Sequence, residues 1–152
     1  MEEQVCWGCV GDAILKSSIM SEGDAAKCSF CNKRRKCCSI AWLTAEVQSV
    51  LNWLIRPGDS YPIFGEDDRV SHEERFGDPL QFWIGDVLGL SDDSLPIVAA
   101  ISRELQPSHR DIADGGESEF PPDINYVERR YRPANVERRW KRFKAEIMYG
   151  RR

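Results

Sequence analysis

The stretch Cys6-Trp-Gly-Cys9, followed eighteen residues later by Cys28-Ser-Phe-Cys31, decides how this 152-residue chain begins to fold. Each Cys-x2-Cys motif can offer two sulfurs from one tight turn, and thiolates bind zinc tetrahedrally at about 2.3 Å. The spacing of the two motifs lies in the range that is typical of zinc sites. We therefore predict that residues 1–40 fold around one structural zinc ion per chain, held by Cys6, Cys9, Cys28 and Cys31.

Other uses of these thiols fit the sequence less well. A redox Cys-x-x-Cys motif usually lies beside a βαβ pattern, which this sequence lacks. An iron–sulfur cluster also takes four cysteines, but two separated knuckles are the commoner zinc arrangement. Reduced thiols with unrelated roles are the remaining alternative. Four thiolates leave a tetrahedral zinc no open position for water, so the predicted site is structural and supplies no catalysis.

Two further cysteines, Cys37 and Cys38, follow the second knuckle closely. Free cysteine behaves as a small apolar residue, so we expect both to pack beneath the knuckle. The alternative is that one of them replaces one of the four predicted ligands. Asp12, three residues after Cys9, is a candidate N-cap for the helix expected next in the chain, or an acceptor of hydrogen bonds near the knuckle.

The composition is that of an ordinary globular protein, with 41% hydrophobic and 30% charged residues. No apolar run reaches the roughly 18 residues of a membrane span, and the acidic start lacks the basic region of a secretory signal. Thiols stay reduced in the cytosol, so we expect a cytoplasmic protein without membrane contact. The net charge of −4 conceals a segregation: residues 57–125 carry four basic and sixteen acidic residues, whereas residues 126–152 carry ten and three.

Beyond the cysteines, the spacing of apolar residues predicts helices. The clearest stripe begins just before the candidate N-cap Thr44 and ends before Pro57, which requires the helix to end by Arg56. Its members are Leu43, Val47, Val50, Leu51 and Leu54. Similar stripes run over residues 80–88, 96–105 and 133–147. The sequence therefore predicts a mainly α fold, in which a four-cysteine zinc-knuckle lobe at 1–40 packs on a bundle of about four helices at 41–152.

Acidic loops are predicted to connect these helices at residues 57–77 and 106–122. Pro62 and Gly65 interrupt the first stretch, and the second contains Asp114-Gly-Gly-Glu-Ser-Glu, which cannot bury much apolar surface. Residues 125–131 alternate enough to form a short strand or an extended link. The final helix is expected to begin at Pro133.

Basic residues suggest a nucleic-acid contact, for which the sequence also offers simpler interpretations. Lys33-Arg-Arg-Lys36 directly follows the second knuckle, and the candidate phosphate contacts are Lys33, Arg34, Arg35 and Lys36. The simpler interpretation is a solvated turn whose cations favour the negative sulfur cluster. In the basic C-terminal region, Trp140 and Phe143 share an apolar stripe, so we expect them in the core rather than as platforms for bases. The basic tail can equally pair with the acidic middle of the chain or with a partner.

Arg103 and His109 have the spacing of the Arg-x(4–6)-His ribonuclease motif of the HEPN helical family. A neutral histidine and a guanidinium can act as base and transition-state stabiliser in RNA cleavage. However, Pro107 interrupts the helix on which both should lie, and Glu104 stands where that family prefers Asn, Asp or His. No other catalytic constellation stands out, so the sequence favours a protein that is not an enzyme, with the ribonuclease as an alternative.

Taken together, these features resemble the HEPN-like N-terminal domain that precedes the RES domain in many bacterial proteins. The resemblance covers almost the whole chain. It rests on Cys6-Trp-Gly-Cys9 through Asp12, on Cys28-Ser-Phe-Cys31, on the helix at 43–55, on Asp86-Val-Leu-Gly-Leu90, on the Tyr126 segment, and on the final helix with Trp140 and Phe143.

The resemblance implies a role beside an enzyme rather than as one. In that family the RES domain, which would follow the last helix, carries NAD-consuming chemistry like that of RES toxins in toxin–antitoxin systems or phage defence. We therefore expect a non-catalytic zinc-stabilised helical module that binds a protein partner or regulates an adjacent RES domain. A nucleic-acid-binding zinc module remains an alternative.

Overall fold

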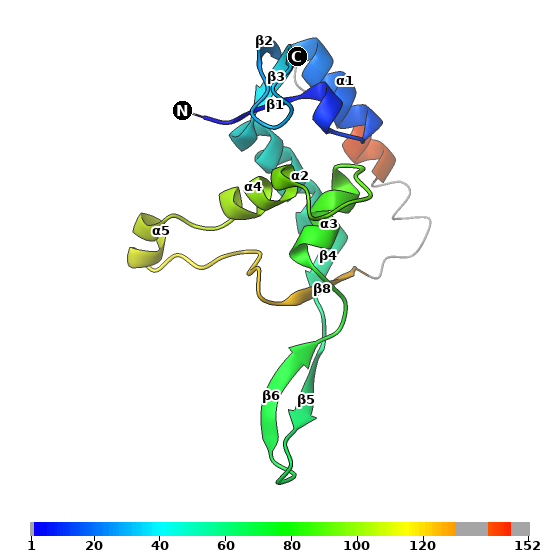
Figure 1. The fold of residues 1–152 in the computed structure, drawn as a ribbon. Helices are drawn as coiled ribbons and strands as arrows, with labels where there is room; N and C mark the ends of the chain where they lie inside the picture. Colours follow the sequence, from blue (N-terminus) through cyan, green and yellow to red (C-terminus); the bar gives the residue numbers. More distant parts are fainter. Residues whose placement is uncertain (1, 130–139, 147–152) are drawn as a thin grey trace.

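The computed structural model describes residues 2–129 and 140–146, and its N-terminal lobe is built around the cysteines (Figure 1). In chain order the lobe contains β1 (Gln4–Cys6), the 3-10 helix η1 (Trp7–Cys9), α1 (Ala13–Glu22), β2 (Asp24–Lys27) and β3 (Arg34–Ser39). β3 is the central strand of an antiparallel sheet, with β1 on one side and β2 on the other.

Asp12 fixes both the start of α1 and the position of the lobe on the rest of the chain. Its Oδ1 atom accepts hydrogen bonds of 3.0 Å from the N–H groups of Ile14 and Leu15, which confirms that Asp12 caps this helix. The backbone N–H groups of Gly11 and Asp12 both donate to the carbonyl of Leu88, at 2.8 Å. One carbonyl thus joins the lobe to the second half of the fold.

Three packed helices form the body of the molecule, and they bury the stripes that the sequence predicts. The described helices after the lobe are α2 (Ile40–Leu54), α3 (Leu80–Val87), α4 (Pro96–Glu104), the short α5 (His109–Ala113) and a helical segment at 140–146. α2, α3 and α4 pack on one another. Ser39, not Thr44, caps α2, because its hydroxyl accepts a 3.1 Å bond from the Trp42 N–H. α2 ends at Leu54.

One hydrophobic core runs through the lobe and the body. Val5 and Ile19 of the lobe belong to the same buried cluster as Leu43 of α2 and Ile84 of α3. Trp140 and Phe143 are half-buried against this core, as their stripe predicts. The predicted start of their helix at Pro133 lies outside the described residues.

A second antiparallel sheet closes the lower end of the body, with β8 (Asn125–Glu128) between β4 (Ile55–Pro57) and β7 (Asp78–Pro79). β8 covers the first four residues of the segment 125–131, for which the sequence predicts a short strand or an extended link; residues 130 and 131 lie outside the described residues. Tyr126 is its anchor, because the side chain is 1% exposed and its hydroxyl donates to the Pro121 carbonyl at 2.8 Å. The Trp83 Nε1 atom donates to the Tyr126 carbonyl at 3.1 Å, which ties the sheet to α3.

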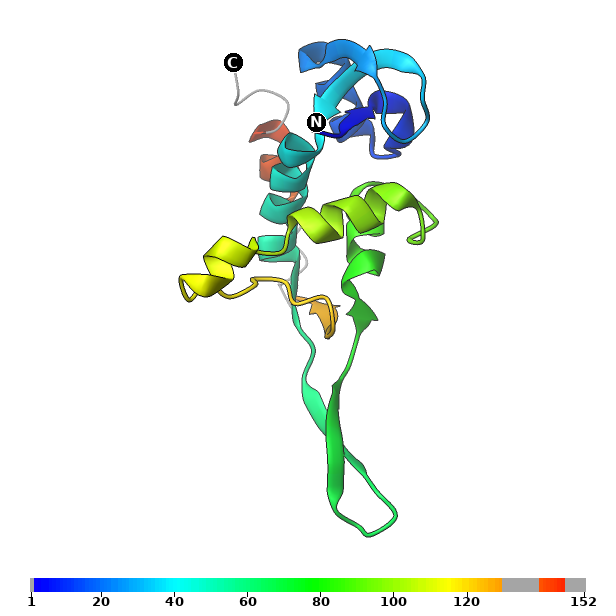
Figure 2. The same ribbon diagram turned by 60° about the vertical axis from the view of Figure 1, so that its left-hand side comes forward.

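Between β4 and β7 the chain leaves the body as a long hairpin, which we call the arm. It consists of β5 (Ser60–Phe64) and β6 (Val70–Arg75), which pair antiparallel and form a sheet of their own. Both views show the arm projecting away from the body, at the end opposite to the cysteine lobe (Figures 1 and 2). Its strands are exposed or half-buried at every position.

The prediction of a mainly α fold with a bundle of about four helices is therefore wrong. The described residues form a mixed α/β structure with eight strands in three small antiparallel sheets. The predicted loop at 57–77 is largely the arm, and the predicted loop at 106–122 contains α5, which a capping box between Ser108 and Asp111 starts. The sequence pattern does not predict the arm, because neither of its faces is buried. Its strands therefore lack the strict apolar alternation that marks a half-buried strand.

Candidate metal centre and exposed surfaces

Two turns of the lobe bring the four predicted ligands together. Cys6 ends β1 and Cys9 ends η1, so the first pair spans one turn of 3-10 helix. Cys28 follows β2, and Cys31 lies in the turn that leads to β3. Asn32 closes this turn in the left-handed region, with φ 61°, and its N–H donates to the Cys28 carbonyl at 3.0 Å.

The sulfur atoms form a compact tetrad that can hold a metal ion. The Sγ atom of Cys6 lies 3.7 Å from that of Cys9 and 3.5 Å from that of Cys31, and the Cys9 and Cys28 sulfurs are 3.6 Å apart. All four sulfurs lie within 4.8 Å of one another. Four thiolates at about 2.3 Å from a central ion have neighbours about 3.8 Å apart, so the observed separations fit tetrahedral coordination. None of these cysteines is in a disulfide.

The charge state of the tetrad follows from its surroundings. Burial raises the pKa of Cys9, and its sulfur neighbours add to this effect. Burial also raises the pKa of Cys6, where the contact with Cys31 adds to the effect and the contact with Cys9 opposes it. Burial acts on Cys28 in the same direction, but backbone N–H groups of Cys31, Cys6 and Phe30 outweigh it and lower the pKa of Cys28 to about 7. The N–H groups of Cys6 and Phe30 each lie 3.4 Å from the Cys28 sulfur. Because four thiolates so close together repel one another, a cation is what allows them all to ionise.

The two remaining cysteines lie outside the tetrad. Cys37 is 2% exposed, packs with Cys6 and Cys28, and points its thiol toward the Ala26 and Arg35 carbonyls at 3.4 Å. It therefore packs beneath the knuckle as a small buried residue. Cys38, the next residue along β3, packs instead against the main core, and burial raises its pKa to about 12.

Three residues of the basic stretch after the second knuckle, Arg34 to Lys36, lie in β3, and Lys33 directly precedes that strand. The Arg35 guanidinium lies 4.7 Å from the centre of the Trp7 ring, in the arrangement of a cation–π contact. A side chain on Gly8 would collide with that guanidinium, so the glycine leaves room for this contact. Lys33, Arg34 and Lys36 are exposed, and within the described part of the chain they form no ion pair. Of the four candidate phosphate contacts, Arg35 therefore already contacts Trp7 in the first knuckle.

The ribonuclease motif is not assembled on one helix. Arg103 lies in the last turn of α4, whereas His109 is the first residue of α5, beyond the turn that contains Pro107. Arg103 borders a hollow of about 440 Å³ together with three carboxylates, those of Glu2, Glu3 and Glu104. These carboxylates would repel an RNA phosphate, so this surface does not favour RNA.

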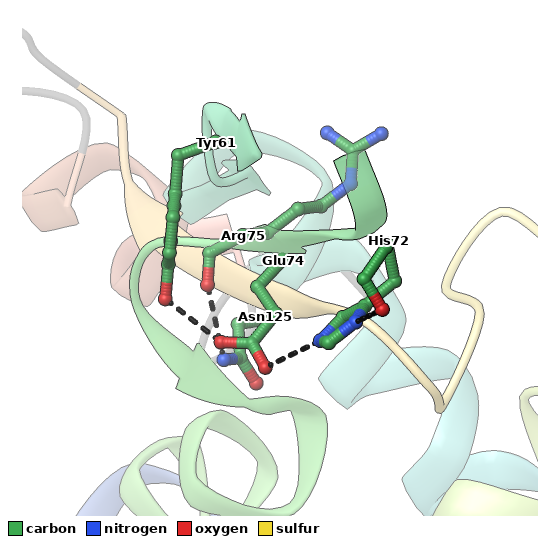
Figure 3. A network of polar contacts seen from close by, with 6 residues as sticks. Tyr61, His72, Glu74, Arg75 and Asn125 are labelled. Atoms are coloured by element: carbon green, nitrogen blue, oxygen red, sulfur yellow. Dashed lines mark hydrogen bonds and ion pairs between the residues drawn. The ribbon is translucent and has the colours of Figure 1, made fainter. Parts of the chain in front are cut away.

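The arm carries a polar network that no sequence pattern predicts (Figure 3). The Tyr61 hydroxyl donates to the Glu74 carboxylate at 3.0 Å, and the His72 Nε2 atom lies 3.2 Å from the other oxygen of that carboxylate. Hydrogen bonds from His72 and Tyr61 lower the pKa of Glu74. At the arm's base, the Asn125 Nδ2 atom donates to the Arg75 carbonyl at 3.2 Å. The network depends on Tyr61 lying opposite Glu74, and this pairing can be recognised only once the register of the two strands is known.

Large apolar side chains on and beside the arm are open to solvent. Phe64 is 62% exposed and lies opposite Val70, which is 55% exposed. Phe76, at the base of the arm, is 58% exposed, and its ring centre lies 4.5 Å from that of Tyr61. These side chains expose apolar area at the tip and at the base of an element that has no core of its own.

Among the described residues, no helix combines the length and the apolar character that crossing a bilayer requires. No protein-family model, no curated protein and no solved structure matches this chain.

Proposed function

We propose that this protein is a non-catalytic interaction module, stabilised by one structural zinc ion on Cys6, Cys9, Cys28 and Cys31. An all-sulfur, four-coordinate donor set is the usual environment of structural zinc in proteins. No two strands of the lobe pair with each other in parallel, so the lobe has no directly paired parallel βαβ unit of the kind beside which redox Cys-x-x-Cys pairs usually lie. In this proposal the protein works in the reducing cytoplasm, where such thiols remain available to the metal.

The observation that carries the proposal is the exposed apolar surface of the arm. A two-stranded hairpin is marginally stable by itself in water, and it gains stability when its side chains pack on something else. Phe64, Val70 and Phe76 are each more than half exposed. Exposed apolar surface on a protruding element is typical of a site of protein–protein contact.

A protein partner is the class that this surface fits, and the proposed role is to bind or regulate that partner. The resemblance to the module that precedes RES domains makes an adjoining RES domain the first candidate. In such an arrangement the zinc lobe would keep the body folded while the arm contacts the NAD-degrading domain. The tetrad itself takes no part in chemistry, because a closed site of four cysteines has no position for a substrate or water.

Site-specific photocrosslinking in cells tests this proposal. A photoreactive phenylalanine analogue replaces Phe64 at the arm tip, and the matched control places it at Met20 on α1, an exposed apolar side chain of the lobe. We expect a discrete crosslinked protein band from Phe64 and none from Met20. Equal labelling at both positions, or no band at Phe64, would contradict a specific contact through the arm.

A second candidate function, nucleic-acid binding, is favoured by the cations of the lobe. Lys27 and Arg34 lie directly opposite each other in the β2–β3 pairing, and like charges there are tolerated more easily when an anion binds nearby. Arg34→Glu should then weaken RNA or DNA binding and lower its salt dependence, whereas Arg69→Glu on the acidic arm should not. RNA cleavage that is lost in His109→Ala would instead support the ribonuclease. Absence of both activities favours the partner module.

A further inference from the structure

We propose that the outer edge of β6 accepts an extended, lysine- or arginine-rich peptide segment as a third strand of the arm. This inference rests on the proposed function and specifies the partner's chemistry and its mode of binding. Adding a strand to a free sheet edge provides backbone hydrogen bonds for affinity, and side-chain contacts for selectivity.

The two edges of the arm differ in their capacity to accept a strand. Pro62 pairs with Glu73, and because proline has no N–H, its nitrogen must lie on the outer edge of β5. That edge therefore lacks a donor at its centre, which is a common way to block strand addition. β6 contains no proline over its six residues. Its outer edge is the open one.

The pairing pattern also tells which backbone groups of β6 point outward. In an antiparallel ladder, residue pairs alternate between two kinds. In the first kind, the backbone N–H and C=O groups bond to the partner strand; in the second kind, they point away from it. Since Pro62 cannot donate, the Pro62–Glu73 pair is of the second kind. The N–H and C=O groups of Glu73 thus point away from β5, and so do those of Arg75, two residues along.

Asn125 occupies the first acceptor on that edge. Its side-chain Nδ2 atom donates to the Arg75 carbonyl at 3.2 Å, from outside the hairpin (Figure 3). This contact has the form of the first hydrogen bond of an added strand. A peptide that continues from Asn125 toward the arm tip would next reach the backbone groups of Glu73.

Charge identifies the chemistry of the incoming segment. A hollow of about 440 Å³ lies where β6 meets the 123–125 segment, and its lining includes the carboxylates of Glu73, Glu74 and Asp123. Among the described residues of that lining Arg75 is the one cation, and it already donates to the Gly58 carbonyl at 2.9 Å. An acidic peptide would be repelled here, whereas lysine or arginine side chains would be attracted.

The apolar residues of the arm tip complete the docking surface. Phe64 and Val70 pair across the strands, so their side chains lie on the same face. An added strand on β6 would place alternate side chains beside Val70 on that face. Glu74 pairs with Tyr61 on the opposite face, so basic side chains of the added strand would lie on the Glu74 face and apolar ones on the Val70 face. The preferred peptide therefore alternates basic residues with apolar β-branched ones.

A binding titration with the full chain tests the proposal. The probe is a fluorescent synthetic peptide in which lysine alternates with valine, and its control carries glutamate at every lysine position. We expect saturable, salt-sensitive binding of the lysine peptide and none of the glutamate peptide. Failure of the lysine peptide to bind would overturn the proposal.

Two proline variants separate edge pairing from simple charge attraction. Glu73→Pro removes an outward N–H on β6 without touching the bonds between the strands, and Ser60→Pro makes the matching change on the outer edge of β5. Glu73→Gln supplies the charge control, because it removes the same carboxylate but keeps the N–H. Loss of a backbone hydrogen bond should weaken binding by up to about tenfold in Glu73→Pro relative to Glu73→Gln, with little change in Ser60→Pro. Equal effects of the two variants would refute binding at β6.

Amide chemical shifts of the unmodified chain locate the bound peptide without a substitution that could unfold the arm. On adding the lysine peptide, the amide signals of β6 should move and become protected from exchange, while those of β5 stay closer to their free positions. Self-association that the peptide displaces would show that a second copy of the chain supplies the basic strand. A photocrosslink at Phe64 without any peptide binding would leave the proposed function standing and overturn this inference alone.

Discussion

Replacing one sulfur of the tetrad should unfold the cysteine lobe, whereas replacing a neighbouring sulfur outside the tetrad should not. The informative pair is Cys9→Ser and Cys37→Ser. Cys9 lies 3.7 Å from the Cys6 sulfur and 3.6 Å from the Cys28 sulfur, inside the proposed coordination sphere. Cys37 is more deeply buried but lies outside the tetrad. The two variants therefore change the same atom type in the same lobe and differ in metal ligation.

The size of the effect follows from linkage between metal binding and folding. A ligand present at a thousand times its dissociation constant stabilises the folded state by about 4 kcal/mol. For a chain of this length, each kcal/mol shifts the melting temperature by roughly 2–4 °C. Cys9→Ser should therefore lower the melting temperature by roughly 8–16 °C and bring the bound zinc well below one ion per chain. Cys37→Ser should cost about 1–2 kcal/mol and keep the metal.

The assays are elemental analysis of protein purified without added zinc, and thermal unfolding followed by circular dichroism. Limited proteolysis locates the change: cuts should appear within residues 1–39 of Cys9→Ser while the body of α2, α3 and α4 resists. The body should resist because α2, α3 and α4 also pack on one another, beyond the core that they share with the lobe. Wild-type protein that is free of metal yet fully folded would refute the reasoning, as would equal zinc loss in both variants.

Three smaller perturbations test the joints between the lobe, the body and the lower sheet. Tyr126→Phe should lower the free energy of unfolding by about 1 kcal/mol, because it leaves the Pro121 carbonyl without its donor; urea denaturation measures this. Asp12→Ala should cost about 1 kcal/mol in the same assay by uncapping α1, whereas Asp12→Asn should be nearly neutral. Gly89→Ala should cost at least about 1–2 kcal/mol, because the residue has φ +71° and an added Cβ would meet the backbone of Asp12.

The sequence was most informative where apolar residues are buried on one side of a helix. The stripe from Leu43 to Leu51 lies buried in α2, and Leu80 to Leu88 packs as predicted in and just after α3. The paired spacing of the cysteines predicted a tetrad that can hold a metal ion. Both patterns work because they are local: helical period and knuckle spacing are set by neighbours a few residues apart.

The sequence was least informative where pairing between distant segments decides the structure. Whether residues 60–64 form a strand depends on residues 70–75 opposite them, and whether Ile55 and Asp78 lie in strands depends on β8, which comes much later in the chain. Pro62 and the surrounding acids argued for a loop. In the structure Pro62 sits at an outer edge, the one kind of strand position that tolerates it.

The separation of the exposed cations of the lobe from the acidic arm has a consequence that can be measured. The two surfaces lie at opposite ends of the described structure (Figure 2). Arg34 on the lobe and Glu73 on the arm belong to different sheets, and neither forms an ion pair among the described residues. Changes at distant sites that share no partner usually add.

Arg34→Glu should therefore leave lysine-peptide binding to the arm unchanged, and Glu73→Pro should leave any nucleic-acid binding unchanged. For each binding reaction, the change in binding free energy of the double variant should equal the sum of the changes in the two single variants. A coupling larger than about 0.5 kcal/mol in a double-mutant cycle would show instead that both charges belong to one surface.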